Sequence, residues 1–410
     1  MWVLSKDENG FIAYTDQTCD VRGIDIDRGR STYTDSFSAA TLTITFANFH
    51  DKYSAWNPNG VWAGLNPRFG TGIPVQVWGY TGGVATPMFT GTTDSVVDSW
   101  PGTIDAEAVM QATDGMKLLA RHTGVQLPTG FEVGLNEFTG QRIHRLATDA
   151  GWTGPRLIDR GWTRMAATDL GGNTIDLMHE VGECEWGWLY VDEAGALVFR
   201  ERDALQTDVR MTTVQWTFTD THATPGICYN GDLQLSVDEA SIWNIAQITE
   251  PNNPYMNRNS MFTWSDQESI DHFGPRTWTR SLPITEGALG VAQVVVMEYA
   301  DDDKHIQSLT FNALPAANRN AAVNIRINDR IRVYRHYPGG FVLKQDLLVQ
   351  GIAHHIVPSG EGRHSDPAVW DVTIRTATAA IIIGFGHWDD PSPDPADGSD
   401  HGWDIDQFGL

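Results

Sequence analysis

Residues 41–46 read TLTITF, an alternation of threonine with leucine, isoleucine and phenylalanine. Successive side chains of a strand point to opposite faces, so this pattern predicts a strand whose apolar residues enter a core while its threonines face water. A turn-rich interval follows at 57–67, a second alternating stretch covers 73–80, and strands continue to about residue 110. Without intervening helices these strands cannot form a parallel sheet, so residues 1–113 are predicted as a closed or sandwiched antiparallel β domain.

The hydrophobic period changes after Thr113. Asp114 is placed to cap a short helix, and Gly151 is placed to stop a longer helix with apolar residues at i, i+3, i+4 and i+7. A turn at 192–195 joins the two strands of a hairpin. The predicted helices and hairpin strands are 116–120, 139–150, 173–183, 186–191 and 196–200. They indicate a small α+β unit over residues 114–225.

Strand patterns return from about residue 226, and a single helical pattern, 288–300, interrupts them. The predicted strands are 232–237, 240–250, 307–311, 329–336, 347–357 and 370–376. The sequence therefore predicts a second β domain over 226–386. The fold class is mainly β, with two tube-like barrel or sandwich domains flanking or carrying an α+β insert.

The last segment, residues 387–410, differs in composition, because it holds seven Asp, several prolines and no Lys or Arg. Such a segment cannot make a core of its own, so we expect it to lie against a neighbouring chain. The residues predicted at this partner interface are Trp388, Asp389, Asp390, Asp394, Asp397 and Trp403. A calcium loop is excluded, since prolines stand where an EF-hand places its first carboxylates.

Charge and composition exclude several classes of protein. The 410 residues carry 28 Lys and Arg against 52 Asp and Glu, and a net charge of −24 repels the phosphates of nucleic acid. No Lys follows a Gly, so the phosphate loop of many ATPases and GTPases is absent, and no cofactor is predicted. Three cysteines without a C-x-x-C pair favour free thiols. No apolar run reaches membrane-spanning length, so no stable membrane insertion is expected.

No catalytic or metal-binding constellation is recognisable. His179-Glu180 opens like a helical zinc motif, but position 183 is Glu, so the pattern fails. His354 and His355 are neighbours in a predicted strand and point to opposite faces, so they cannot hold one ion together. Cys184 stands between two glutamates, which raise the pKa of a thiol and suppress its reactivity. We therefore predict no catalytic and no metal residues.

Two observations leave alternatives open. Asp25 and Asp27 share one face of a strand and are interpreted as a solvated or interface edge rather than a metal site. The 16 tryptophans could line a carbohydrate-binding cleft, although packing and assembly are the commoner uses of tryptophan. A cell-wall hydrolase, which would need two carboxylates or a His-centred group in a cleft, and a carbohydrate-binding module remain as rival hypotheses.

Several segments together resemble the minor tail proteins of long-tailed actinobacteriophages, which are related to phage baseplate hub proteins. The matching segments, in chain order, are 25–31 (DIDRGRS), 87–95 (PMFTGTTDS), 112–120 (ATDGMKLLA), 187–200 (GWLYVDEAGALVFR) and 327–333 (INDRIRV). The resemblance covers about residues 20–376. Residues 50–53 (HDKY) depart from it, since they replace the DGRF core of the family's pattern.

The resemblance implies a structural protein of the virion tail tip, assembled in the host cytoplasm. The resemblance implies a trimer in which each chain contributes two tube-like domains. The three chains together then present six lobes to the six-fold tail tube. Its implied partners are the distal tail protein ring, the tape measure protein and tail fibre or tip proteins, with DNA passing through as cargo. A six-fold distal tail protein shares related β domains and is the alternative within this class.

Overall fold

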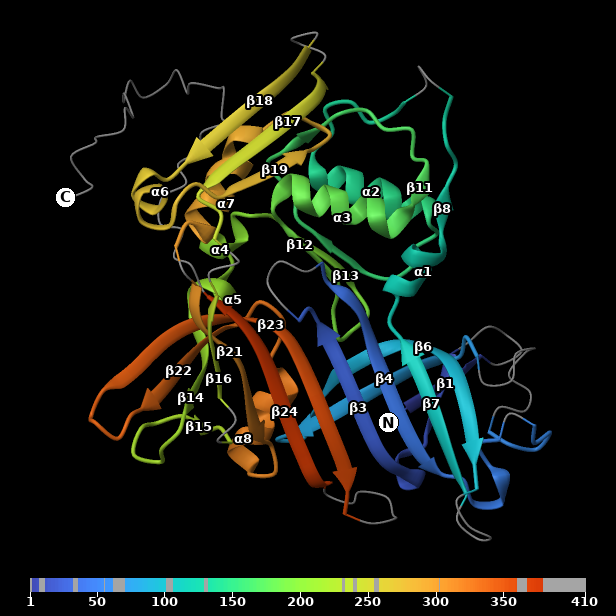
Figure 1. Cartoon of the computed structure of the whole chain (residues 1–410). Helices are drawn as coiled ribbons and strands as arrows, with labels where there is room; N and C mark the ends of the chain where they lie inside the picture. The colour runs from blue at the N-terminus through green and yellow to red at the C-terminus, as the bar shows by residue number, and fades with distance from the viewer. Residues whose placement is uncertain are drawn as a thin grey trace, which may run out of the picture.

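The computed structural model describes most of the chain, and Figure 1 shows two β units side by side beneath a layer of helices and short sheets. The described residues are 2–6, 12–31, 36–54, 56–61, 71–100, 106–128, 132–230, 233–238, 242–253, 258–301, 303–359 and 367–378. The predicted partner-interface residues, 388–403, lie outside them. No helix among the described residues is long and apolar enough to cross a membrane.

The first β unit is an antiparallel sheet with strand order β2-β1-β5-β6-β7-β4-β3, which confirms the predicted antiparallel pairing. Its strands are β1 (Trp2–Lys6), β2 (Ile12–Asp16), β3 (Val21–Gly29), β4 (Ser38–Ala47), β5 (Pro74–Thr81), β6 (Val84–Ser99) and β7 (Glu107–Thr113). Two 3-10 turns, η1 (Thr18–Asp20) and η2 (Phe49–Asp51), flank β3 and β4. Leu42, Ile44 and Phe46 are buried in β4, as the alternation at 41–46 predicts.

The second β unit contains parallel as well as antiparallel pairs. Strand β14 runs parallel to both β15 and β22, whereas β22, β23, β24, β21 and β16 pair antiparallel in succession. Its elements are β14 (Val214–Thr219), β15 (Ile227–Cys228), β16 (Gln234–Asp238), β21 (Asp303–Asn312), α8 (Ala316–Asn324), β22 (Arg330–His336), β23 (Val342–Pro358) and β24 (Pro367–Thr378). Strand β23 is long enough to pair with β24 along one edge and with the first β unit along the other.

The two β units form one continuous sheet. Strand β3 pairs antiparallel with β23, from Gly29 opposite Gly351 to Ile24 opposite Ile356. A single hydrophobic cluster runs through both units and includes Leu42 and Ile44 of the first and Val349 and Ile374 of the second. Shared backbone hydrogen bonds and a shared core therefore fix the two units relative to each other.

The α+β layer packs above the sheet (Figure 1). From residues 114–225 it takes α1 (Met116–Arg121), β8 (Thr123–Gly124), α2 (Thr139–Asp149), β9 (Arg156–Ile158), β10 (Arg164–Met165), β11 (Gly172–Asn173), α3 (Thr174–Glu185), β12 (Trp188–Val191), β13 (Leu197–Arg200), α4 (Ala204–Thr207) and α5 (Val209–Thr212). From later in the chain it takes β17 (Ile245–Asn253), β18 (Arg258–Ser265), α6 (Gln267–Phe273), β19 (Thr277–Ser281), β20 (Ile284–Glu286) and α7 (Ala288–Tyr299). The mainly β fold with a small α+β unit is thus confirmed.

Two details differ from the sequence-based expectations. The prediction of one helix within 226–386 is wrong, because α6 and α8 accompany α7 there. Both are too short to give a clear periodic signal, and α6 depends on a local cap in which Asp266 accepts a hydrogen bond from Ser269 N at 3.0 Å. In addition, residues 246–300 share a hydrophobic cluster with residues 116–199, across the predicted boundary at residue 225.

Candidate functional site at the junction of the three units

The turn between β12 and β13 presents one carboxylate to both β units. Asp192 shapes the turn, because its Oδ1 accepts hydrogen bonds from Ala194 N at 3.0 Å and Ala196 N at 2.8 Å. Burial raises the pKa of the Asp192 carboxyl above its usual range. Gly195 closes the turn at a φ of 85°, a conformation that glycine adopts without strain. The turn so formed places Glu193 against the sheet.

Glu193 is held by arginines from both β units. Arg28 of β3 lies 3.1 Å from it and Arg326, just before β22, lies 2.8 Å from it. The Arg28 and Glu193 side chains are only 4% and 9% exposed, so this pair is desolvated. Thr90 of β6 also donates to the Glu193 carbonyl at 3.0 Å. One turn of the α+β layer therefore ties the first β unit to the second.

The residues that follow Arg28 make the joint between the two sheets. Gly29 has a φ of 97°, and a Cβ there would lie 2.2 Å from the Gln350 carbonyl oxygen. Arg30 N donates to that same carbonyl at 3.0 Å, and Arg30 Nε donates to Gln350 Oε1 at 2.7 Å. The RGR segment at 28–30 thus supplies an ion pair, a close backbone approach and a side-chain hydrogen bond in succession.

A second arginine–carboxylate pair fixes the turn before β22. Asp329, with no exposed surface, accepts from Arg210 Nε at 2.5 Å and from Arg210 Nη2 at 2.7 Å. Burial raises the pKa of Asp329, and the guanidinium opposes that shift. Asn328 adopts a φ of 70°, which asparagine tolerates better than most residues. The INDRIRV segment of the resemblance is therefore a turn and strand start clamped by Arg210.

The open face of the joined sheet carries a shallow hollow of about 270 Å³ across β3, β4, β23 and β24, and three aspartates are among the residues that line it. Asp25 lies 2.6 Å from His355 Nδ1, and Asp27 lies 2.5 Å from Arg375 Nη2. Asp371 and three threonines also line the hollow. Both aspartates are exposed and ion-paired, as a solvated position predicts, but β3 pairs with β4 and β23 on its two sides and is therefore not an edge strand.

The other candidate residues are placed as follows. His354 is 2% exposed while its neighbour His355 is exposed, so the two histidines do face opposite sides. Burial lowers the pKa of His354 to about 3. Cys184 is fully buried, and burial with help from nearby glutamates raises its pKa, as predicted. In the described part of the chain, no group of three or more His, Cys, Asp or Glu side chains could hold a metal ion.

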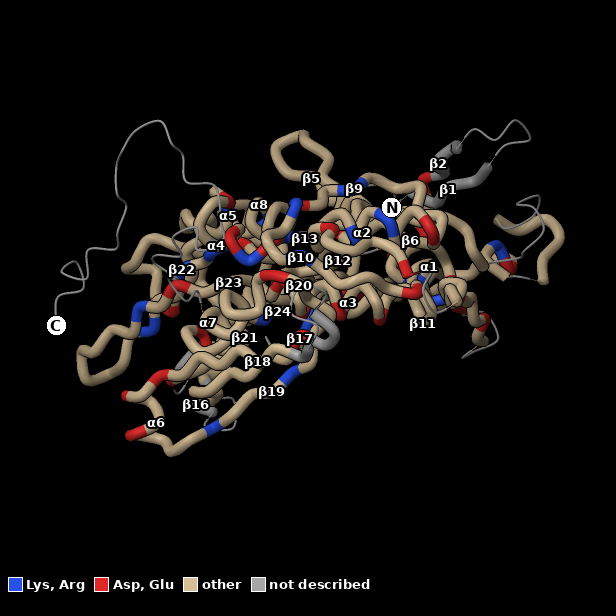
Figure 2. The backbone as a smooth tube through the Cα atoms, turned by 90° about the horizontal axis from the view of Figure 1, so that it is seen from above, with Lys and Arg blue, Asp and Glu red and all other residues tan. Residues whose placement is uncertain are grey.

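Basic and acidic positions are interspersed along the described part of the backbone rather than gathered into one stripe (Figure 2). Most of the arginines at the junction are engaged by carboxylates, as Arg28, Arg210 and Arg375 illustrate. A contiguous basic surface is what a phosphate-gripping protein needs. The pairing therefore fits the strongly acidic net charge rather than nucleic-acid recognition.

Several solved structures of tail proteins have a similar fold. The chain is similar to the 43 kDa tail protein of prophage MuSo2 from Shewanella oneidensis (TM-score 0.55, 15% identity, 92% of this chain and 98% of that chain). It is also similar to a tail protein from Neisseria meningitidis (TM-score 0.57, 11% identity, 92% and 96%). A third match is prophage tail protein gp18 from Listeria monocytogenes (TM-score 0.51, 10% identity, 91% and 94%).

No family model matches the chain, and no curated protein matches its sequence. The similarity to the three tail proteins nevertheless extends over nearly the full length of each. The chain therefore has the fold of phage and prophage tail proteins.

Proposed function

We propose that this protein is a structural component of a phage tail tip, a baseplate hub that caps the distal tail tube of a long-tailed actinobacteriophage. In this role three copies form a ring that adapts the six-fold tube to a three-fold tip. The protein acts by assembly and not by catalysis. It works in host attachment and DNA passage, and its place is the virion tail tip after assembly in the host cytoplasm.

The observation that carries this proposal is the side-by-side joining of two β units through β3 and β23. Each chain offers two lobes in a fixed relation, so three chains offer six, which suits a six-fold partner on one side. The α+β layer above the sheet differs from the β units, and three copies of it give a three-fold surface on the other side. The full-length likeness to tail proteins supports the same assignment.

We further propose that the hollow on the joined sheet faces the channel through which DNA passes. Asp25, Asp27 and Asp371 are the carboxylates among the described residues that line the hollow, and His355 and Arg375 pair with Asp25 and Asp27. A negatively charged channel wall repels the DNA backbone and makes few attractive contacts with it. The DNA is therefore not slowed as it passes through the channel. Replacing the three aspartates with lysine is expected to slow DNA release from assembled virions.

The proposed partners are further copies of this chain, the distal tail protein ring, the tape measure protein and tail fibre or tip proteins. The predicted interface residues Trp388, Asp389, Asp390, Asp394, Asp397 and Trp403 lie outside the described residues. They remain candidates for contacts within this assembly, because an acidic segment with two tryptophans suits a neighbour that offers arginine and an apolar surface.

The test is electron microscopy of intact virions, counting the copies of this chain in the tail tip. Three copies against a six-fold tube support the hub assignment. Six copies in one ring would assign the chain as a distal tail protein. Absence of the chain from the tail, together with clearing of host cell walls in a zymogram, would replace the structural role with that of a hydrolase.

A further inference from the structure

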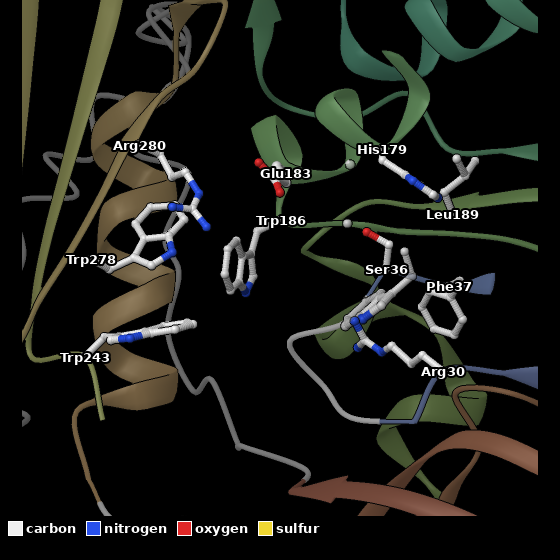
Figure 3. Close-up of a pocket in the computed structure, with 13 residues that line it drawn as sticks. Arg30, Ser36, Phe37, His179, Glu183, Trp186, Leu189, Trp243, Trp278 and Arg280 are labelled. Atoms are coloured by element: carbon white, nitrogen blue, oxygen red, sulfur yellow. The ribbon is translucent and has the colours of Figure 1, made fainter. Parts of the chain in front are cut away.

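A cavity of about 120 Å³ lies where β3, the α3–β12 connection and the later part of the α+β layer meet. Figure 3 shows Trp186 at its centre, with Trp243 and Trp278 on one side and Phe37 and Arg30 on the other. The lining residues beyond these five include Ser36, His179, Glu183, Leu189 and Arg280. Neither the junction at Glu193 nor the acidic hollow uses this site.

The aromatic rings that line the cavity pack against one another and against Tyr299. Trp186 meets Trp278 edge to face with ring centroids 5.6 Å apart, and Trp243 lies 4.7 Å from Tyr299. Trp186 Nε1 donates to Glu298 at 2.7 Å, which fixes the ring orientation. Such pre-set rings form an apolar surface that loses little entropy when a ligand binds. The cavity is thus built to receive an apolar or aromatic group.

Two arginines stand on opposite walls of this aromatic surface (Figure 3). Arg280 is exposed, and its guanidinium lies 5.3 Å from the centre of the Trp278 ring. Arg30 is 9% exposed and lies 4.6 Å from the centre of the Phe37 ring. An occupant with aromatic and carboxylate groups side by side would match both the rings and the cations.

The described chain ends next to this cavity. Strand β24 closes at Thr378, and its Ala377 pairs with Leu348. Leu348 belongs to the same small hydrophobic cluster as Phe37 and Trp188, two of the cavity-lining residues. Arg375 Nε also donates to the Arg30 carbonyl at 3.0 Å. The chain therefore leaves β24 beside the cavity wall.

Residues 381–390, which follow a few positions later, read IIIGFGHWDD. Trp388 stands ten positions after Thr378, and an extended chain over ten positions spans about 35 Å. We propose that the cavity is the docking site of this segment of the same chain, with apolar and aromatic side chains against Trp186, Trp243 and Trp278. Asp389 and Asp390 then face the two arginines, and the tether gives a high effective concentration. Docking of Trp388, Asp389 and Asp390 within the chain leaves Asp394, Asp397 and Trp403 as the candidates for contact with a neighbouring chain.

The test is photo-crosslinking of the full chain carrying Trp388→p-benzoylphenylalanine. Crosslinks to peptides that contain Trp186, Trp243 or Trp278 are expected after irradiation and mass spectrometry. Placing the same probe at Trp56, which is 90% exposed on the first β unit, is the control for unspecific reaction. Mixing isotope-labelled with unlabelled chains shows whether each crosslink forms within one chain or between two.

Arg280→Glu is the decisive variant, because its exposed side chain can be changed without opening the core. Reversing one exposed charge is expected to lower the crosslink yield about fivefold, and high salt should lower it too. Arg121→Glu is the matched control, since Arg121 is 73% exposed on α1 and does not line the cavity. It should leave the yield unchanged.

Crosslinks that form only between chains would overturn docking within one chain and give the cavity to a second copy. A Trp388 probe that reacts elsewhere, or an Arg280→Glu yield equal to that of Arg121→Glu, would overturn the proposal altogether. The proposal would also be overturned if the Trp388 probe gave no crosslinks and soluble cell-wall glycan slowed hydrogen exchange of the residues that line the cavity. That result would assign the tryptophans to carbohydrate.

Discussion

Glu193→Ala removes the carboxylate shared by Arg28 and Arg326 and so tests whether this turn holds the three units together. Arg28 sets the magnitude, because its side chain is 4% exposed and would become an unpaired buried charge. Breaking one end of a buried ion pair costs about 3–5 kcal/mol. The Arg326 side chain is 48% exposed, and an exposed pair of that kind adds at most about 1 kcal/mol. We therefore expect the β3–β23 ladder to open more easily by about 3–5 kcal/mol.

Native-state hydrogen exchange is the suitable assay, since a chain of several units need not unfold in one step. Amides at 24–29 and 351–356 should exchange faster by about two to four orders of magnitude, at tenfold per 1.4 kcal/mol. Glu107→Ala is the matched control. Glu107 forms an ion pair with Arg22 at 2.9 Å, but the Arg22 and Glu107 side chains are 26% and 32% exposed, so this pair is partly solvated. Equal effects of the two variants would refute the reasoning. Arg28→Met combined with Glu193→Leu should recover most of the loss.

Three further predictions concern local stability, each measured by native-state hydrogen exchange of the amides around the substituted residue, in the variant and in the wild type. Burial raises the pKa of Asp114 to about 6, so its stabilising contribution is largest below pH 4 and is lost as the pH rises through 6. Relative to Asp114→Asn, the free energy of local unfolding of the wild type should fall by about 2 kcal/mol between pH 4 and pH 7. His354 behaves oppositely, because burial lowers its pKa to about 3. Relative to His354→Gln, the wild type should lose about 2 kcal/mol as the pH falls from 7 to 5; equal slopes would contradict this. Gly29→Ala brings a Cβ within 2.2 Å of the Gln350 carbonyl, and should cost more than Gly83→Ala, whose Cβ meets nothing within 4 Å. The Gly83 variant shows the cost of positive φ alone, about 1 kcal/mol; equal losses would exclude steric conflict at the joint.

Local patterns predicted the elements well where one face of an element meets one core. The alternation at 41–46 gave β4, and the helical spacing at 139–150 gave α2, because in both cases burial follows the period of the backbone. The expected strand 240–250 instead begins at Ile245 in β17. Pairing between distant segments, such as β14 parallel to β22, has no local signal. It depends on which segments share a core, and periodicity does not specify that.

The junction shows how much of a site could be anticipated. The RGR segment and the turn at 192–195 were both recognised, but nothing in either segment indicated that Arg28 would meet Glu193, 165 residues away. A glycine between two arginines was the usable signal, because a small residue at the end of a strand indicates close backbone approach. The partner could be found only once the hairpin and the sheet were placed in space.

Residues 50–53 (HDKY) differ at every position from the DGRF core of the pattern that the chain resembles. In the resemblance, the glycine of DGRF corresponds to Asp51, and Asp51 has a φ of 54°, which glycine adopts freely and aspartate tolerates. The phenylalanine corresponds to Tyr53, which is fully buried and stacks on Phe46 with ring centroids 4.2 Å apart. Its hydroxyl lies 2.7 Å from Asp20 Oδ2, so the added polar group is satisfied. Asp51 thus adopts the positive φ that a glycine favours and Tyr53 supplies a buried aromatic ring, so the observed turn is compatible with the DGRF pattern although each of the four residues differs from it.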